Sequence, residues 1–307
     1  MLRLLDLLNR IEADQALGPL FVLKGGTALN LFVFDGIPRL SVDIDLNYIG
    51  EADVGRMRAS RPEVEDRLVR LCAGAGLVPR RRATSHAGGK WILPYRNALG
   101  GADRIEIDLN YVLRVPLWEP TYREAAPLAA RGAVHVRVLD EHELAGSKIV
   151  ALLTRVATRD LFDAHHLLTG CALDVKRLRV AAVVYGAMSP TDWRTVSPDD
   201  ISVDGRDIRS KLAPVLRTGV RDAVLADPSW GDRLRDECRA ALKRLFPLTA
   251  DENEFLTALR ERGEIRPELL TDNSELASRI AAQPMLRWRA QQRGRAAPEV
   301  SAEDVLG

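Results

Sequence analysis

The chain has 307 residues, of which 46% are hydrophobic, and a formal net charge of +1 at pH 7. This composition allows a sizeable core and excludes a globally disordered chain, and the length allows two domains of ordinary size. The near-neutral charge excludes a strongly basic field over the whole protein but not a local basic patch. Cys72, Cys171 and Cys238 lie far apart and show no zinc-binding spacing, which indicates a reducing, cytoplasmic setting.

The first segment is rich in leucine, but polar residues interrupt it. Leu4, Leu5, Leu8 and Ile11 follow a helical stripe, which predicts an amphipathic helix rather than a signal peptide. No apolar run approaches the roughly 20 residues that a membrane-spanning helix requires. We therefore expect a soluble protein that does not contact a membrane.

The next segment predicts two strands joined by a glycine turn and a short helix. Phe21–Lys24 reads as a buried strand, and Gly25 and Gly26 follow it directly. Thr27–Phe34 reads as a short helix with Thr27 as its N-cap. A turn leads to a second strand, Val42–Ile49, which carries two aspartates.

The rest of the first half predicts one long helix and further strands. The helix is Val54–Leu71, a crossover that Pro62 is expected to interrupt or to start. Three segments are predicted as strands, the first two as a neighbouring pair: Lys90–Asn97, Arg104–Val112 and His135–Leu139. A proline-marked connector, Val115–Pro127, precedes the last strand.

From Glu141 onward the pattern becomes helical. Glu141–Val156 and Asp160–Leu168 read as helices, and Pro190–Asp207 as a polar loop. We therefore predict an α/β (α+β) protein with two domains, a mixed-sheet domain at 1–140 and an all-helical domain at 141–307.

Two carboxylates on the second strand form the first part of a candidate site. Residues two apart in a strand share a face, so Asp43 and Asp45 can hold Mg²⁺ or Mn²⁺ together. Asp108, on the strand within Arg104–Val112, is the predicted third ligand and a candidate general base for a two-metal site. The alternative for all three is a solvent-facing position on an amphipathic strand.

The turn between these strands forms the second part. Gly25, Gly26 and Thr27 open the predicted helix, whose free N–H groups and dipole would face an anion such as a triphosphate. A carboxylate pair for the metal beside such a turn for the phosphates would suffice to bind a nucleoside triphosphate.

Charged residues further along predict a phosphate clamp. If one straight helix runs through them, Lys148, Arg155, Arg159 and Asp163 fall within a stripe of roughly 80°. The alternative is a solvated face with ordinary ion pairs, and a possible cap at Thr158 suggests a break that would change the phase. The stretch 279–295 contains five arginines and a tryptophan, which suits single-stranded nucleic acid or a plain surface helix.

Together these motifs resemble the AbiEii/AbiGii family of nucleotidyltransferase-like toxins. The similarity rests on Lys24–Leu29, Arg39–Leu46, Lys148–Asp163 and the C-terminal IAAQPMLRWR. The resemblance implies a nucleotidyltransferase fold followed by a helical domain that contributes Lys148 and Asp163. It also implies a toxin–antitoxin or phage-defence pair, with a separately encoded antitoxin protein as partner.

Relatives in this family transfer nucleotides from an NTP to the 3′ end of tRNA, which blocks translation. By resemblance, Asp43 and Asp45 would bind metal, Lys148 would hold the triphosphate and Asp163 would be a further essential acid. In some relatives the antitoxin phosphorylates the hydroxyl two places before the first aspartate, which makes Ser41 a candidate regulatory phosphorylation site. The alternatives are nucleotide transfer to a protein or a small molecule, and an inert module that binds RNA or a partner.

Overall fold

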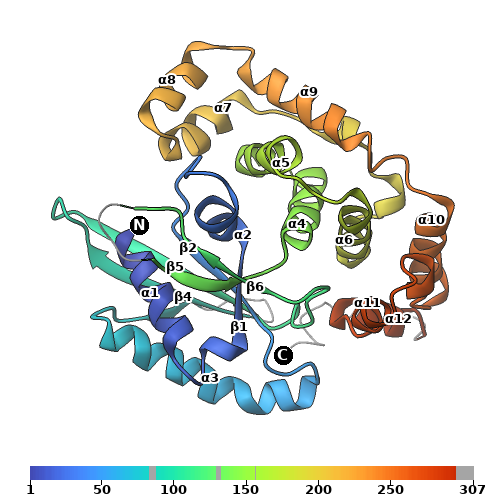
Figure 1. Cartoon of the computed structure of the whole chain (residues 1–307), viewed down its shortest axis with the longest axis horizontal. Helices are drawn as coiled ribbons and strands as arrows, with labels where there is room; N and C mark the ends of the chain where they lie inside the picture. The colour runs from blue at the N-terminus through green and yellow to red at the C-terminus, as the bar shows by residue number, and fades with distance from the viewer. Residues whose placement is uncertain (83–87, 129–132, 156, 295–307) are drawn as a thin grey trace.

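The computed structural model describes residues 1–82, 88–128, 133–155 and 157–294. Its centre is a sheet with the strand order β3-β4-β5-β2-β1-β7-β6 (Figure 1). The strands in chain order are β1 (Phe21–Lys24), β2 (Asp43–Tyr48), β3 (Arg80–Arg82), β4 (Gly88–Arg96), β5 (Ala102–Asn110), β6 (Thr121–Glu124) and β7 (His135–Val138).

The sheet is mixed. β2 pairs in parallel with β5 on one side and antiparallel with β1 on the other. β4 and β5 are neighbours, as predicted, and pair antiparallel, while β1 pairs in parallel with β7. The predicted mixed α/β fold class is therefore confirmed.

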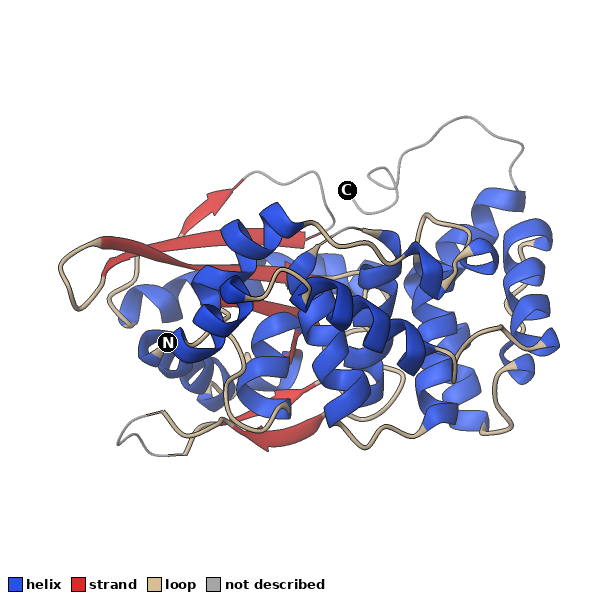
Figure 2. Cartoon of the chain, turned by 90° about the horizontal axis from the view of Figure 1, so that it is seen from above, coloured by secondary structure: helices blue, strands red, loops and turns tan. Residues whose placement is uncertain are grey.

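Helices cover both faces of this sheet and continue beyond it. They are α1 (Leu2–Ala13), α2 (Gly25–Ala28), α3 (Val54–Gly74), α4 (Glu141–Thr154), α5 (Thr158–Gly170), α6 (Val175–Met188), α7 (Gly205–Asp207), α8 (Thr218–Ala226), α9 (Trp230–Leu242), α10 (Ala250–Thr257), α11 (Ser274–Ala281) and α12 (Pro284–Gly294). Figure 1 shows α1 and α3 on one side of the sheet and α2, α4 and α5 on the other. In Figure 2 the strands lie at one end of the molecule and helices fill the other.

Alternation along the central strands explains which side chains enter the core. On β2, Ile44 and Leu46 are buried, and on β5, Ile107 and Leu109 are completely buried. Their neighbours on the opposite face of each strand are the acidic residues, which are only partly buried. The hydrophobic pattern thus directs the carboxylates to one common face, because strand side chains alternate.

Two local predictions about helices were wrong. Pro62 lies inside α3 without interrupting it, because burial of the helix face that contains Val64 and Leu68 outweighs one missing backbone hydrogen bond. Thr27 is not an N-cap: α2 begins at Gly25 and continues as a π-helical turn, Leu29–Val33.

Loop predictions also needed correction. The connector Val115–Pro127 contains β6, which pairs antiparallel with β7. The predicted polar loop Pro190–Asp207 contains short helical turns, because Ser197 and Asp204 each cap one.

All the described strands precede α4, as the sequence predicts. The buried hydrophobic residues nevertheless form one cluster that runs from α1 to α12. The division into domains at 140/141 therefore stays a prediction. Within the described part of the chain, no helix is both long and apolar enough to cross a membrane.

Close packing of α4 against α6 depends on Gly146. A Cβ atom there would lie 2.6 Å from Ala181 Cβ and 2.8 Å from the Ala181 backbone. Gly146→Ala is expected to lower the free energy of unfolding by about 1–3 kcal/mol through overpacking, measured by urea denaturation.

The matched control for this variant is Gly74→Ala, at the end of α3, where an added Cβ meets no atom within 4 Å. It is expected to leave stability unchanged or to raise it by up to about 1 kcal/mol. Equal stability of the two variants would contradict tight packing between α4 and α6.

Candidate active site

The site is built on the acidic face of β2 and β5. Because these strands are parallel and in register, Asp45 lies beside Asp108 and Asp43 lies beside Glu106. Lys24 on β1 is the register partner of Asp45, and Lys90 on β4 is that of Asp108. Across the four strands these residues form one row, in which Asp45 and Asp108 lie between Lys24 and Lys90. The predicted convergence of Asp43, Asp45 and Asp108 on one face agrees with this register.

The glycine turn lies directly against this row. Gly25 has a φ of 73°, and a Cβ atom there would be 2.2 Å from Asp45 Oδ2. Both features require glycine, because other residues rarely adopt this conformation and would collide with the carboxylate. The turn and the acidic strand are therefore in contact, as the hypothesis of a shared phosphate and metal site requires.

The ionised forms of Asp43 and Asp45 are disfavoured, and the pKa values of both carboxyl groups are raised. Burial raises the pKa of Asp45, and Asp108 and Asp43 raise it further while Lys24 opposes them. Burial also raises the pKa of Asp43, with a contribution from Glu106. Excess negative charge at a partly buried face favours binding of a cation.

Glu106 behaves differently from these aspartates. It pairs with Lys90 at 2.7 Å and with Arg104 at 2.8 Å, and the hydrogen bond from Lys90 keeps its pKa below the usual range. Its charge is therefore balanced within the protein. We infer that Glu106 positions the strand next to Asp43 rather than binding a cation.

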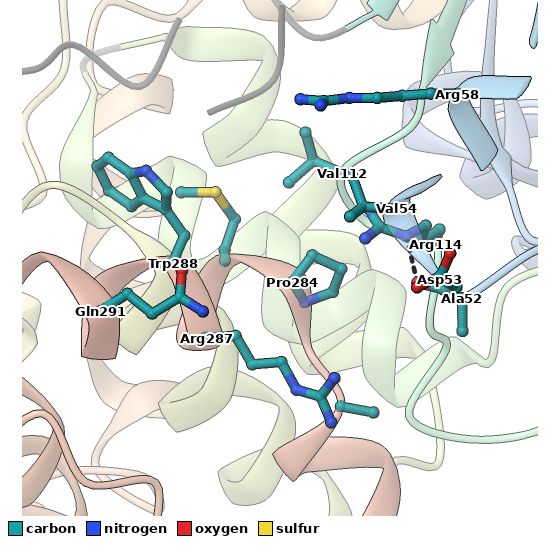
Figure 3. Close-up of a pocket in the computed structure, with 12 residues that line it drawn as sticks. Ala52, Asp53, Val54, Arg58, Val112, Arg114, Pro284, Arg287, Trp288 and Gln291 are labelled. Carbon is teal, nitrogen blue, oxygen red and sulfur yellow. Dashed lines mark hydrogen bonds between the residues drawn. The ribbon is translucent and has the colours of Figure 1, made fainter. Parts of the chain in front are cut away.

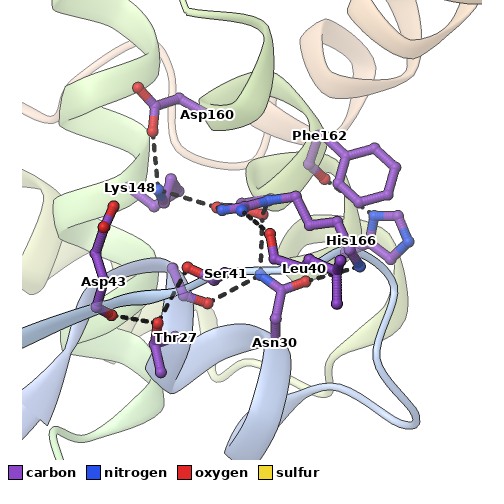
Figure 4. Close-up of polar contacts among 12 residues, drawn as sticks. Thr27, Asn30, Leu40, Ser41, Asp43, Lys148, Asp160, Phe162 and His166 are labelled. Carbon is purple, nitrogen blue, oxygen red and sulfur yellow. Dashed lines mark hydrogen bonds and ion pairs between the residues drawn. The ribbon is translucent and has the colours of Figure 1, made fainter. Parts of the chain in front are cut away.

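Thr27 joins the turn to the acidic strand from inside. Its side chain is completely buried, and its hydroxyl contacts Ser41 Oγ at 3.0 Å and the Asp43 carbonyl (Figure 4). The Thr27 side chain thus fixes the start of β2, and because the whole residue is buried, only Gly25 and Gly26 of the turn face solvent. Ser41 lies two residues before Asp43 and is partly exposed.

A buried ion pair connects the sheet to the helical half. Arg39 donates from Nε and Nη2 to the two carboxylate oxygens of Asp163, at 2.7 and 2.6 Å. Asn30 completes the network, accepting from the Arg39 N–H at 3.2 Å and donating to Asp163 at 3.3 Å. All three side chains are at least 95% buried. The bidentate geometry fixes α5 relative to the segment before β2.

A second set of ion pairs adjoins the first. Lys148 contacts Asp160 at 2.8 Å and Asp163 at 3.1 Å, and Arg155 contacts Asp160 at 2.7 Å. Figure 4 shows Lys148 between Asp160 and the end of β2 that contains Asp43. Burial opposes the charge of Lys148, but Asp163 and Asp160 raise its pKa overall. Lys148 is therefore a charged residue already held by two acids.

The condition for a single charged stripe, one straight helix, is not met, and the chain breaks near Thr158 as the alternative indicated. α4 ends at Thr154, Arg155 has an extended backbone, and α5 begins at Thr158. The break turns α5 so that Asp163 faces Arg39 as well as Lys148. Arg155 is 65% exposed on its side chain, and Arg159 is exposed and electrostatically coupled to Asp43. These two arginines remain on the solvent side of the cluster.

Sequence reasoning missed several members of the site. The missed residues are Lys24, Arg39, Lys90, Glu106 and Asp160. Lys24 and Arg39 lie inside the motif Lys24–Leu46. Glu106 lies two residues before Asp108 on the same strand, so strand alternation predicts that the two side chains share a face. Arg39 and Asp160 required knowledge of which helix meets which strand.

The C-terminal arginines have mixed roles. Arg279 pairs with Glu119 and Glu275, and Arg289 donates to the Met188 carbonyl and has its pKa lowered by burial. These two support packing and weaken the case for a free basic tail. Arg295 lies outside the described residues.

No three His, Cys, Asp or Glu side chains in the described part of the chain are grouped closely enough to hold a metal by themselves. Asp45 with Asp43 or Asp108 still fits Mg²⁺, which binds through one or two carboxylates together with substrate phosphates. The contact between the Gly25 turn and Asp45 provides the place for those phosphates.

With this geometry in place, the sequence was compared with known families. The family model described as nucleotidyl transferase AbiEii toxin, type IV toxin–antitoxin system, matches residues 6–291. The chain belongs to the AbiEii family. The AbiEii match spans both the acidic strands and the helices that carry Lys148 and Asp163.

A solved structure supports the fold. MenT4, a nucleotidyltransferase toxin from Mycobacterium tuberculosis H37Rv, aligns over 91% of this chain and 90% of its own. The TM-score is 0.60 and the sequence identity is 19%, so the likeness shows the nucleotidyltransferase fold. No curated protein sequence matches the chain.

Asp163→Asn tests the buried network. It leaves Arg39 and Lys148 without their shared carboxylate, so the free energy of unfolding should fall by about 3–5 kcal/mol, measured by chemical denaturation at pH 7. The control, Asp6→Asn, breaks an exposed pair with Arg10 and should change it by less than ~1 kcal/mol.

The stability difference between wild type and Asp163→Asn should also depend on pH. Burial opposes ionisation of Asp163, but Lys148 and Arg39 lower its pKa overall from 3.8. Its stabilising contribution is therefore complete above pH 4 and is lost as the pH falls through the lowered pKa. The stability difference between wild type and Asp163→Asn should shrink below pH 4; a constant difference would contradict the assignment.

Proposed function

We propose that this AbiEii nucleotidyltransferase toxin transfers NMP from an NTP to the 3′ end of an RNA, with tRNA as the acceptor. The observation that carries the proposal is the contact of the Gly25 turn with Asp45, beside Asp108 in register on β5. It brings a phosphate-binding turn and paired carboxylates within reach of one triphosphate. The family match supports the reaction class.

The NTP phosphates would lie against the backbone of Gly25 and Gly26, which are partly exposed, while the buried Thr27 supports the turn from inside. The exposed guanidinium groups of Arg155 and Arg159 lie on the solvent side of the site and would offset phosphate charge. Lys148 would act at shorter range, because its charge already influences Asp45. Its pairs with Asp160 and Asp163 hold the ammonium in a fixed position, which is how electrostatic preorganisation operates.

A divalent cation, Mg²⁺ or Mn²⁺, would be held by two carboxylates, Asp45 with Asp43 or Asp108, and by the phosphates of the NTP. When bound, it would supply charge stabilisation at the phosphates and lower the pKa of the attacking hydroxyl. The raised pKa values of Asp43 and Asp45 support this assignment, since a bound cation would relieve their repulsion.

The acceptor RNA presents its 3′-hydroxyl to the α-phosphate. Asp108 would accept the hydroxyl proton, a new bond forms between the hydroxyl oxygen and the α-phosphorus, and the bond to the β-phosphate oxygen breaks. Pyrophosphate leaves with its electron pair. Positioning of the two substrates by the turn and the acidic strands supplies most of the acceleration in such transfers.

Modification of the tRNA 3′ end would block aminoacylation and stop translation, which accounts for toxicity and for the need of an antitoxin. Ser41 would be a control point for that antitoxin. A phosphate on its hydroxyl adds between one and two negative charges next to Asp43. It would also remove the contact with Thr27 that fixes the start of β2.

Asp45→Asn should abolish incorporation of labelled NTP into tRNA in the presence of Mg²⁺, because the turn and the cation lose their shared carboxylate. The loss should be at least roughly 100-fold in kcat. Purified protein is incubated with total tRNA and each of the four labelled NTPs, and labelled RNA is quantified on a gel.

The matched control is Asp103→Asn, an exposed residue on the same strand as Asp108, which should keep wild-type activity. Circular dichroism checks that both variants fold. Full activity of Asp45→Asn would refute the role of the acidic face. Label that appears on a protein or small molecule in a cell extract, and not on RNA, would refute the acceptor.

A further inference from the structure

A cavity lies away from the acidic residues, where α12 faces the start of α3 (Figure 3). Its volume is about 290 Å³, and its walls include Arg58, Arg114, Pro284, Met285, Arg287 and Trp288. Ala52 and Val112, which also line it, follow the C-terminal ends of β2 and β5. Asp43 begins β2, so the cavity is at the other end of this strand from the acidic residues.

The cavity combines positive charge with a flat apolar surface. Three arginines line it, and the one acidic residue on its wall is Asp53, whose carboxylate already accepts the Arg56 N–H at 2.9 Å as a helix cap. Trp288 and Pro284 supply the apolar surface on the same helix as Arg287, and Figure 3 shows Arg58 and Arg114 across the cavity from them. Guanidinium groups beside an aromatic ring are the chemistry that binds a phosphate and an adjacent base.

Arg114 is the buried centre of this charge. It is 6% exposed and is held by carbonyls, donating from Nε to Ala52 and from Nη1 to Tyr111. Burial lowers the pKa of Arg114, Asp53 opposes this shift, and repulsion from Arg287 and Arg58 adds to it. Neighbouring cations that repel one another are stabilised when an anion arrives.

The walls of the cavity are fixed before any ligand binds. Gln283, immediately before α12, donates to the Val115 carbonyl at 2.6 Å, and Arg279 of α11 donates to the Pro116 carbonyl at 3.4 Å. These contacts attach the C-terminal helices to the segment that follows β5. A preformed cavity loses little entropy when its ligand binds.

The size of the cavity suits one nucleotide of a longer strand. The cavity volume of about 290 Å³ lies at the lower end of the range for small-molecule pockets and suits one base with its phosphate. Ala52 is seven positions after Asp45 in the sequence, so the two places are at most about 23 Å apart along an extended chain. A short single strand of RNA spans such a distance.

We propose that this cavity is an anchoring subsite for one unpaired nucleotide of the RNA acceptor, remote from the end that receives the new nucleotide. Arg287 and Arg58 would contact its phosphate, and Trp288 would stack on its base. The inference rests on the proposed RNA acceptor. It gives a role to the C-terminal motif that contains Met285, Arg287 and Trp288, while Arg289 of the same motif is used in packing.

The test measures binding of deproteinised total tRNA to the full chain, without NTP or metal, at several salt concentrations. Arg287→Ala should raise the Kd roughly tenfold and lower the slope of log Kd against log salt by about one contact. Gln291→Glu, which adds a negative charge on the cavity wall without removing any arginine, should raise the Kd in the same direction.

The matched control is Arg221→Ala, an exposed arginine of α8 that pairs with Asp222 at 3.1 Å. It should leave the Kd and the salt slope unchanged. Thermal melting confirms that each variant folds. Unchanged RNA affinity in both cavity variants, or an equal loss in Arg221→Ala, overturns the subsite, as does capture of an acidic protein at this cavity with RNA affinity intact.

The two proposals fail in different ways. If wild type labels tRNA but the cavity variants bind it normally, the subsite is wrong and the proposed function stands. If Arg287→Ala loses RNA affinity but wild type transfers no nucleotide to RNA, the subsite stands and the proposed reaction is wrong.

Discussion

The bidentate pair between Arg39 and Asp163 is the constraint on which the rest of the site depends. It joins the segment before the acidic strand to α5, with both side chains almost completely buried. A buried pair of this kind contributes little net stability compared with apolar packing, but breaking it leaves a charge without compensation. Its main effect is therefore positional: it holds Lys148 and Asp160 at a fixed place beside β2.

The acidic face illustrates how a protein prepares a site for a charged substrate. Asp45 and Asp108 lie side by side between Lys24 and Lys90, and the charge of Glu106 is already balanced by Lys90 and Arg104. Beside the Gly25 turn, Lys24 opposes the raised pKa of Asp45, but burial and the negative charges of Asp108 and Asp43 outweigh it. The fold thus concentrates unbalanced charge at one point and supplies backbone N–H groups next to it.

Much of the fold could be predicted from the sequence, since the strongest signals were local. Apolar alternation located β2 and β5, and helical periodicity located α3, α4 and α5. Errors arose where tertiary packing decides the outcome. Pro62 sits inside a helix that its neighbours stabilise, and β6 forms because β7 offers a partner edge. The stripe through Lys148 and Asp163 failed because the chain breaks between α4 and α5.

The sequence by itself determined that Asp43 and Asp45 share one face, since strand alternation acts over a few residues. The need for glycine at position 25 follows from the tertiary structure, through a positive φ and the contact with Asp45. Only the tertiary structure decided that β5 would pair in parallel and put Asp108 beside Asp45. It also decided that Asp163 would meet Arg39, 124 residues away. Such contacts depend on which surfaces bury one another, and that choice is made by the whole core rather than by any local pattern.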